Sequence, residues 1–187
     1  MDLFKYLEKI QNIFDLLPSK YMLLNGNIEK NLKFYCGMMI ESDQGPTSYV
    51  MDKKIQGHEI DLLAFLDSEC LNASEFKCTF ASDRRSTLTS ANDAIKKIQK
   101  TVEVSSLSMA NKQIIHFLNK SDPCSSTNLN PDWIKSKYPT NQQLSTETLI
   151  EQYKKHLGTQ LQNSRFITYN FADNALALDV IVVDIAR

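Results

Sequence analysis

Three charged residues lie inside apolar, strand-like segments of this 187-residue sequence. Asp61 interrupts the run GHEIDLLAFL, and Glu75 and Lys77 follow 14 and 16 positions later inside ASEFKCTF. A charged side chain is costly to bury unless it is paired or holds an ion. We therefore expect these three residues to have a chemical role.

The spacing of Glu75 and Lys77 fits one face of a strand. Residues i and i+2 of a strand point the same way, so Phe76 between them turns to the opposite face, where it can pack in the core. If the two segments form a hairpin, Asp61 lies beside this pair. Two carboxylates and the Phe76 main-chain carbonyl then make the oxygen-only set that Mg²⁺ (or Mn²⁺) prefers.

Such a site suits hydrolysis of a phosphodiester. The metal would lower the pKa of a water and stabilise the charge that develops on the phosphate. Lys77 at the rim can orient or help deprotonate the attacking water. The competing interpretation leaves Asp61 and Glu75 at solvent-exposed strand ends, with Glu75 and Lys77 as a surface ion pair that contributes little.

The pattern of Asp61, a spacer and Glu75-x-Lys77 resembles the PD-(D/E)xK core of restriction-endonuclease-like and Holliday-junction-resolvase-like nucleases. The segments GHEIDLLA and SEFKCT are especially similar to those of small resolvase-like members, although Ile60 stands where many members have proline. The resemblance implies a metal-dependent DNA endonuclease. In it, Asp61, Glu75 and the Phe76 carbonyl would bind Mg²⁺ and Lys77 would be catalytic, and many such relatives act as homodimers.

The family resemblance also implies an acidic residue from an earlier helix. Glu29, in the segment Gly26-Asn27-Ile28-Glu29, fits that place and would assist catalysis through a metal-bound water. An acidic residue near a helix N-terminus is favourable in any protein, so its position alone does not settle its role. Four other acids compete for the same role, namely Glu41, Asp43, Asp52 and Glu59.

A DNA partner requires positive charge near the site. The net charge of the chain is −1, so any contact with phosphates needs a local basic patch. Five basic residues follow the predicted site and are candidate nucleic-acid contacts, namely Arg84, Arg85, Lys96, Lys97 and Lys100. The alternative is a solvated helix face, which is the usual role of a lysine row.

Apolar periodicity and turn residues predict interleaved helices and strands. Helices are expected over 2–17, from Asn27 to near Gly37, over 90–104 after a polar loop at Arg84 and Arg85, and over 145–157. Strands are expected over 47–54, 57–66, 73–80, 111–120, 165–171 and 175–186. This order favours an α/β protein with a central mixed β-sheet flanked by helices.

We expect one domain spanning 1–187. Its restriction-endonuclease-like αβββαβ core would cover about 27–118, and residues 121–187 would form an extension with a long loop, a helix and two strands. The four cysteines and three histidines lack zinc-site spacing. The N-terminus does not resemble a signal peptide and no apolar run reaches membrane-spanning length, so we expect a cytoplasmic protein without membrane contact.

Two other functions fit the same residues. The first is a non-catalytic module that uses this fold to bind DNA or a protein. The second is an unrelated α/β interaction protein, such as a partner that neutralises a toxin. Metal-dependent cleavage that is lost on changing Lys77 would separate the nuclease from both.

Overall fold

The structure is a computed structural model that describes residues 1–14, 28–42, 47–120, 143–170 and 177–186. The predicted helix start at Gly26-Asn27, the competing acid Asp43 and most of the predicted long loop lie outside the described residues. The order of helices and strands agrees with the sequence prediction. The helices are α1 (Phe4–Phe14), α3 (Ile28–Ser42), α4 (Arg84–Val102) and α6 (Thr146–Leu157), and the strands are β1 (Thr47–Ile55), β2 (His58–Leu66), β3 (Glu69–Phe80), β4 (Asn111–Asn119), β5 (Leu161–Asn170) and β6 (Ala177–Ile185).

Within the described residues, six strands form one mixed sheet in the order β1-β2-β3-β4-β6-β5. β3 and β4 pair in parallel, and the other neighbouring strands pair antiparallel. A parallel pair needs a crossover connection, and α4 supplies it here. The predicted mixed α/β sheet is therefore confirmed.

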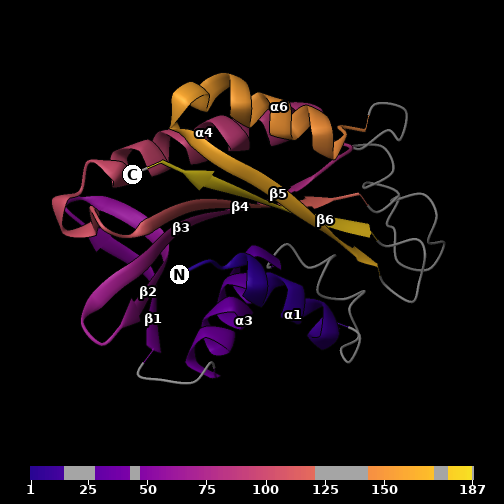
Figure 1. Ribbon diagram of the computed structural model, residues 1–187. Coiled ribbons are helices and arrows are strands. Elements are labelled where there is room, and N and C mark those ends of the chain that lie inside the picture. The colour runs from indigo at the N-terminus through magenta and orange to yellow at the C-terminus, as the bar shows by residue number, and fades with distance from the viewer. Residues whose placement is uncertain (15–27, 43–46, 121–142, 171–176, 187) are drawn as a thin grey trace.

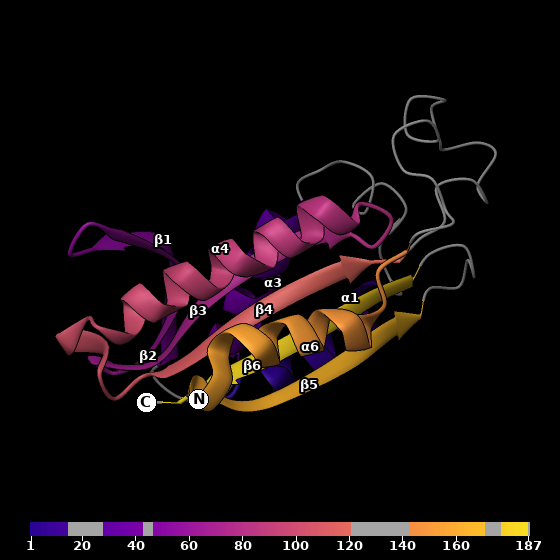
Figure 2. The same ribbon diagram turned by 90° about the horizontal axis from the view of Figure 1, so that it is seen from above.

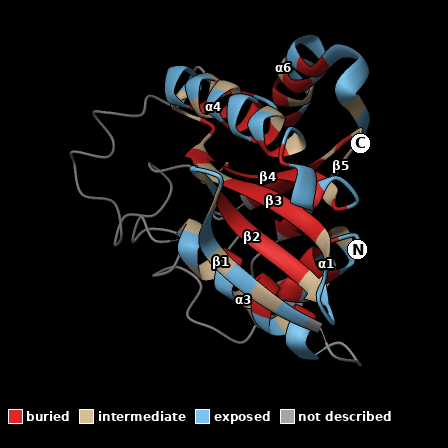
Figure 3. Cartoon of the chain, turned by 90° about the vertical axis from the view of Figure 1, so that its left-hand side faces the viewer, coloured by how far each residue is buried: buried red, intermediate tan, exposed pale blue. Residues whose placement is uncertain are grey.

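Helices cover both faces of this sheet (Figures 1 and 2). On one face, α1 and α3 bury residues such as Leu7 and Leu32 against Phe76 and Phe117 of the central strands. On the other face, α4 and α6 pack on β4 and β6 through a second apolar cluster. The central strands carry apolar residues on both faces because both are covered, whereas the edge strand β1 is mostly exposed (Figure 3).

Four predicted element boundaries were wrong. Strand β3 begins at Glu69, inside the expected turn, and β5 begins at Leu161, four residues earlier than expected. The other two concern helices.

Helix α4 begins at Arg84, so Arg84 and Arg85 lie in its first turn and not in a polar loop. The Asp83 side chain accepts a hydrogen bond from the Ser86 backbone N–H, which caps the helix at this earlier position. Buried Thr87 then anchors the polar first turn to the protein.

The wrong boundary of the other helix is the end of α3. Gly37 was expected near that end, but it lies inside a helix that continues to Ser42. A Cβ atom at Gly37 would lie 2.3 Å from a ring carbon of Tyr49. The glycine therefore lets α3 approach strand β1 closely and does not end the helix.

Among the described residues, no helix is both long and apolar enough to cross a membrane.

Candidate active site

The candidate site lies where β2 and β3 separate. These strands pair from Leu66 opposite Glu69 to Leu62 opposite Ser74. Continued in the same register, the next pair would be Asp61 and Glu75, but no such pair forms in the described strands. Beyond this point β2 remains paired with β1, and β3 remains paired with β4. The divergence leaves backbone groups of β3 available to side chains.

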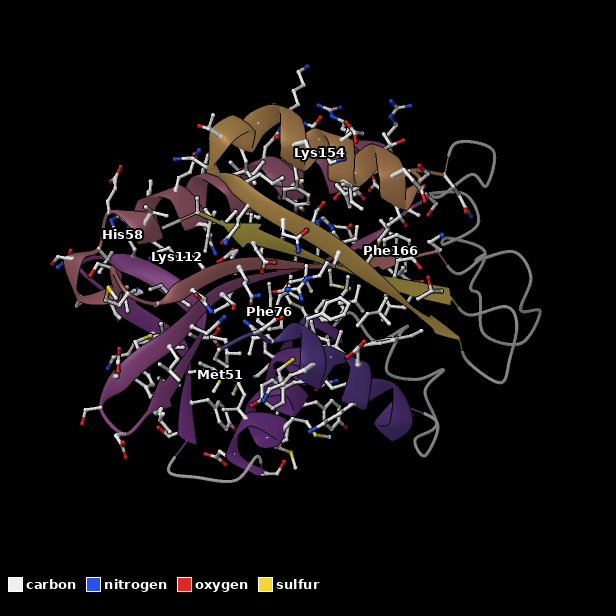
Figure 4. All side chains as sticks on the ribbon, in the orientation of Figure 1. Met51, His58, Phe76, Lys112, Lys154 and Phe166 are labelled. Carbon is white, nitrogen blue, oxygen red and sulfur yellow. The ribbon has the colours of Figure 1, made fainter. Side chains whose placement is uncertain are left out.

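Asp61 occupies this gap and binds the freed backbone of β3. Its Oδ2 atom accepts a hydrogen bond of 2.7 Å from the Phe76 N–H. The N–H and C=O groups of one strand residue point to the same side, so the Phe76 carbonyl also faces the gap. The Phe76 ring turns away into the core, where it stacks on Phe117 with the ring centroids 6.0 Å apart (Figure 4). The expected opposite orientations of the Phe76 side chain and its charged neighbours are therefore present.

Glu75 is buried in the same gap. Its Oε1 atom accepts hydrogen bonds from Lys77 Nζ at 2.6 Å and from Lys97 Nζ at 2.9 Å. Burial and the charge of Asp61 outweigh these lysines and raise the pKa of Glu75 from 4.5 to about 7. Only 4% of Asp61 and 2% of Glu75 is exposed. The alternative that placed both carboxylates in solvent was therefore wrong.

Lys33 of α3 is a further charged residue of this site, and sequence reasoning missed it. Its Nζ atom lies 2.7 Å from Asp52 Oδ1, 3.5 Å from Asp61 Oδ1 and 4.0 Å from Glu29 Oε1. Burial by itself lowers the pKa of Lys33, but the hydrogen bond to Asp52 and the surrounding carboxylates raise it further than burial lowers it. The ammonium group is therefore charged. Only the spacing of Glu29 and Lys33, four residues apart on one helix, could have indicated it.

Asp52 reaches Lys33 through an irregularity of β1. The register between β1 and β2 passes from Met51 opposite Leu62 to Lys53 opposite Ile60, so Asp52 and Asp61 do not pair. Asp52 has a φ angle of +51°, a left-handed conformation that is uncommon for a residue other than glycine. Such strained residues often occur at functional sites, because the surrounding structure must hold them in place.

The structure shows which of the acids that competed for the accessory role face the site and which do not. Burial raises the pKa of Glu29, while the charge of Lys77 opposes this shift and that of Asp61 adds to it. Glu29 thus faces the site, as does Asp52 through Lys33. Glu41 is exposed at the end of α3, and exposed Glu59 is among the charges that raise the pKa of Lys97.

The predicted basic patch is divided along α4. Lys97 contacts Glu75, and this pair, with the nearby acids, raises the pKa of Lys97 although burial alone would lower it. Lys96 and Lys100 are exposed near it. Arg84 and Arg85 are exposed in the first turn of α4, about 20 Å from Lys97 along the helix axis at about 1.5 Å per residue. Of the five predicted contacts, Lys97 is the one that the structure brings to the carboxylates.

A buried hydrogen-bonded chain lies on the same face of the sheet. His116, whose Cα lies opposite Lys77 in the β3–β4 register, contacts Tyr153 through Nδ1 and Thr79 through Nε2, each at 2.7 Å. Burial and the charge of Lys77 lower the pKa of His116 to about 3. The imidazole is therefore neutral near pH 7 and packs as a satisfied core residue beside the site.

The donor atoms of the gap fit a hard cation. Asp61, Glu75 and the Phe76 carbonyl present oxygen atoms alone, which suits Mg²⁺ or Mn²⁺ with water completing the coordination. Among the described residues, no group of three or more His, Cys, Asp or Glu side chains is arranged to hold a metal. The protein thus offers a small ligand set of two carboxylates and a carbonyl, with lysines around it.

Comparisons of this chain with protein-family models, with curated proteins and with solved structures found no match.

Proposed function

We propose that this protein is a metal-dependent nuclease that hydrolyses phosphodiester bonds in DNA, with a restriction-endonuclease-like αβββαβ core. The observation that carries the proposal is the convergence of Asp61, Glu75, the Phe76 backbone and Lys77 at the divergence of β2 and β3. The buried carboxylates and the raised pKa of Glu75 support it, because a strand that serves only packing has no need of them.

The residues have distinct roles in this proposal. Asp61 and Glu75, with the Phe76 carbonyl, would hold Mg²⁺ or Mn²⁺, which supplies positive charge to the phosphate and activates water. Lys77, held by Glu75 at 2.6 Å, would position the attacking water and offset charge on the phosphate. Glu29 would orient water from the α3 side.

The DNA contact is also proposed. Lys97 is long and 44% exposed at its side chain, so it can leave Glu75 for a phosphate without breaking the core. Lys96 and Lys100 would extend the contact, and Arg84 and Arg85 would meet the backbone farther along the duplex. A homodimer would place two such sites on the two strands.

A cleavage assay tests the proposal. The purified protein is incubated with Mg²⁺ or Mn²⁺ and with plasmid, linear duplex, single-stranded or four-way-junction DNA. We expect Lys77→Ala to reduce cleavage by about 10²- to 10⁴-fold, the range typical for loss of a positioned catalytic group. Lys154→Ala is the matched control, because Lys154 is 48% exposed at its side chain, pairs with exposed Glu151 at 2.7 Å on α6, and is not among the proposed metal or DNA contacts.

The results separate the nuclease from its alternatives. Cleavage by wild type and Lys154→Ala, but not by Lys77→Ala, supports the site. If wild type binds DNA and does not cut any of the four substrates with either metal, the protein is a binding module. If it neither binds nor cuts DNA and co-purifies with a protein, it is an interaction protein instead.

A further inference from the structure

The site contains a second cluster of carboxylates, on the opposite side of Asp61 from the Phe76 backbone. Asp61 directs Oδ2 toward Phe76 and Oδ1 toward Lys33. Glu29 and Asp52 approach the same Lys33 ammonium group from α3 and β1. Three carboxylates from three elements thus lie within 4.0 Å of the Lys33 ammonium group, and with this group among them they are not arranged to hold a metal.

The Lys33 side chain is unusually enclosed for a charged group. Only 6% of Lys33 is exposed, and a charge buried to this extent is tolerated where its partners compensate for lost hydration. Asp52 holds the ammonium at 2.7 Å, with its own backbone in the left-handed region. The surrounding structure therefore maintains Lys33 in this place.

We propose that Lys33 is the built-in second cation of the site, so that the protein binds one divalent ion on the Glu75 side of Asp61 and not two. This inference rests on the proposed nuclease function. Nucleases that use two ions hold them about 3.5–4 Å apart and share a carboxylate between them. Here Asp61 is the carboxylate between the Phe76 side and the Lys33 side.

Geometry makes the two cations mutually exclusive at this position. An ion bound by Asp52 and Asp61 would lie about 2.1 Å from an oxygen of each, in the space where Lys33 Nζ now lies 2.7 Å and 3.5 Å from them. Binding there requires Lys33 to leave, which would place an ammonium group without partners in a largely buried region. Lys33 is thus a positioning residue: it fixes Asp61 and leaves one place for metal.

The test counts Mn²⁺ ions bound per chain, by calorimetry and by the loss of the free-ion electron paramagnetic resonance signal. Lys33→Met removes the charge and keeps the length of the side chain. Lys33→Arg keeps the charge, and Lys30→Met is a matched control because Lys30 is exposed on the same helix. We expect one ion for wild type, Lys33→Arg and Lys30→Met, and two for Lys33→Met.

A second readout follows the dependence of cleavage on Mn²⁺ concentration. The rate of cleavage by wild type should follow a simple saturation curve as the Mn²⁺ concentration rises. The rate for Lys33→Met should rise more steeply with Mn²⁺ concentration, as expected when two ions must bind. If Lys33→Met does not fold, Lys33→Gln, which can still donate to Asp52 but has no charge, carries the same expectation.

The outcomes distinguish this inference from the function on which it rests. Two ions in wild type, or one ion in folded Lys33→Met and Lys33→Gln, would overturn the inference and leave the nuclease proposal standing. Absence of both Mn²⁺ binding and cleavage in wild type would overturn the nuclease proposal itself, and the inference with it.

Discussion

Replacing Glu75 with glutamine should stabilise the metal-free protein at pH 8. The pKa of Glu75 is raised from 4.5 to about 7 in the folded state, so folding favours the neutral carboxyl group. The wild-type free energy of unfolding therefore falls as the pH rises from about 4.5 to about 7. At about 1.4 kcal/mol per pH unit, the complete loss is about 3 kcal/mol. Glutamine resembles the neutral form and avoids this loss.

The assay is urea unfolding of wild type and Glu75→Gln at several pH values between 4 and 8, with a chelator present. Groups distant from Glu75 titrate alike in both proteins and cancel in the difference. We expect nearly equal stability at pH 4 and a growing advantage of Glu75→Gln that levels off above pH 7. Glu151→Gln is the control, since Glu151 forms an exposed pair with Lys154 and should change stability by less than about 1 kcal/mol.

The opposite sign would refute this reasoning. If Lys77 and Lys97 hold Glu75 as a structural ion pair, removing its charge leaves two cations without their partner, and Glu75→Gln becomes less stable at pH 8. Added Mn²⁺ gives a second reading. It should raise the stability of wild type more than that of Glu75→Gln, because binding to the folded state stabilises it.

Two further predictions concern the framework of the site. Gly37→Ala should lower the free energy of unfolding by about 1–3 kcal/mol, because the added methyl group would overlap the Tyr49 ring, and chemical denaturation measures the loss. Unchanged stability would show that α3 and β1 are not closely apposed. Tyr153→Phe should cost about 1–3 kcal/mol, because it leaves buried His116 Nδ1 without its hydrogen bond, and the cost should be the same at pH 6 and pH 8 since His116 stays neutral in this range. A cost that grew on acidification would show that His116 becomes protonated in the variant.

The sequence predicted the order of helices and strands because most of them carry strong periodic signals. The segment GHEIDLLAFL is continuously apolar around Asp61, as expected for a strand covered on both faces, and it forms β2. The first turn of α4 was missed because Arg84-Arg85-Ser86-Thr87 is polar and resembles a loop. Its helical structure depends on the Asp83 cap and on the burial of Thr87, neither of which apolar periodicity reveals.

The residues of the site also divide into those that local sequence rules predict and those that depend on tertiary structure. The alternation of a strand places Glu75 and Lys77 on one face, and the hairpin brings Asp61 to them. Local rules are therefore enough to predict these three residues. Lys33 and Asp52 required knowledge of how α3 packs on the sheet and of an irregularity in β1. Both are tertiary features, and the four-residue spacing of Glu29 and Lys33 is the one local signal that could have indicated Lys33.

The charges of the cluster connect the two proposals. The cluster contains four carboxyl groups (Glu29, Asp52, Asp61 and Glu75) and three amino groups (Lys33, Lys77 and Lys97), so its formal charge with every group ionised is −1. Within this cluster, burial and then the charge of Asp61 raise the pKa of Glu75 although two lysines contact it. One divalent ion would convert this formal charge into a single positive charge, which matches the single negative charge of a phosphodiester. A second ion would add two more positive charges beside Lys33, so the electrostatics favour one ion, as the geometry around Asp61 does.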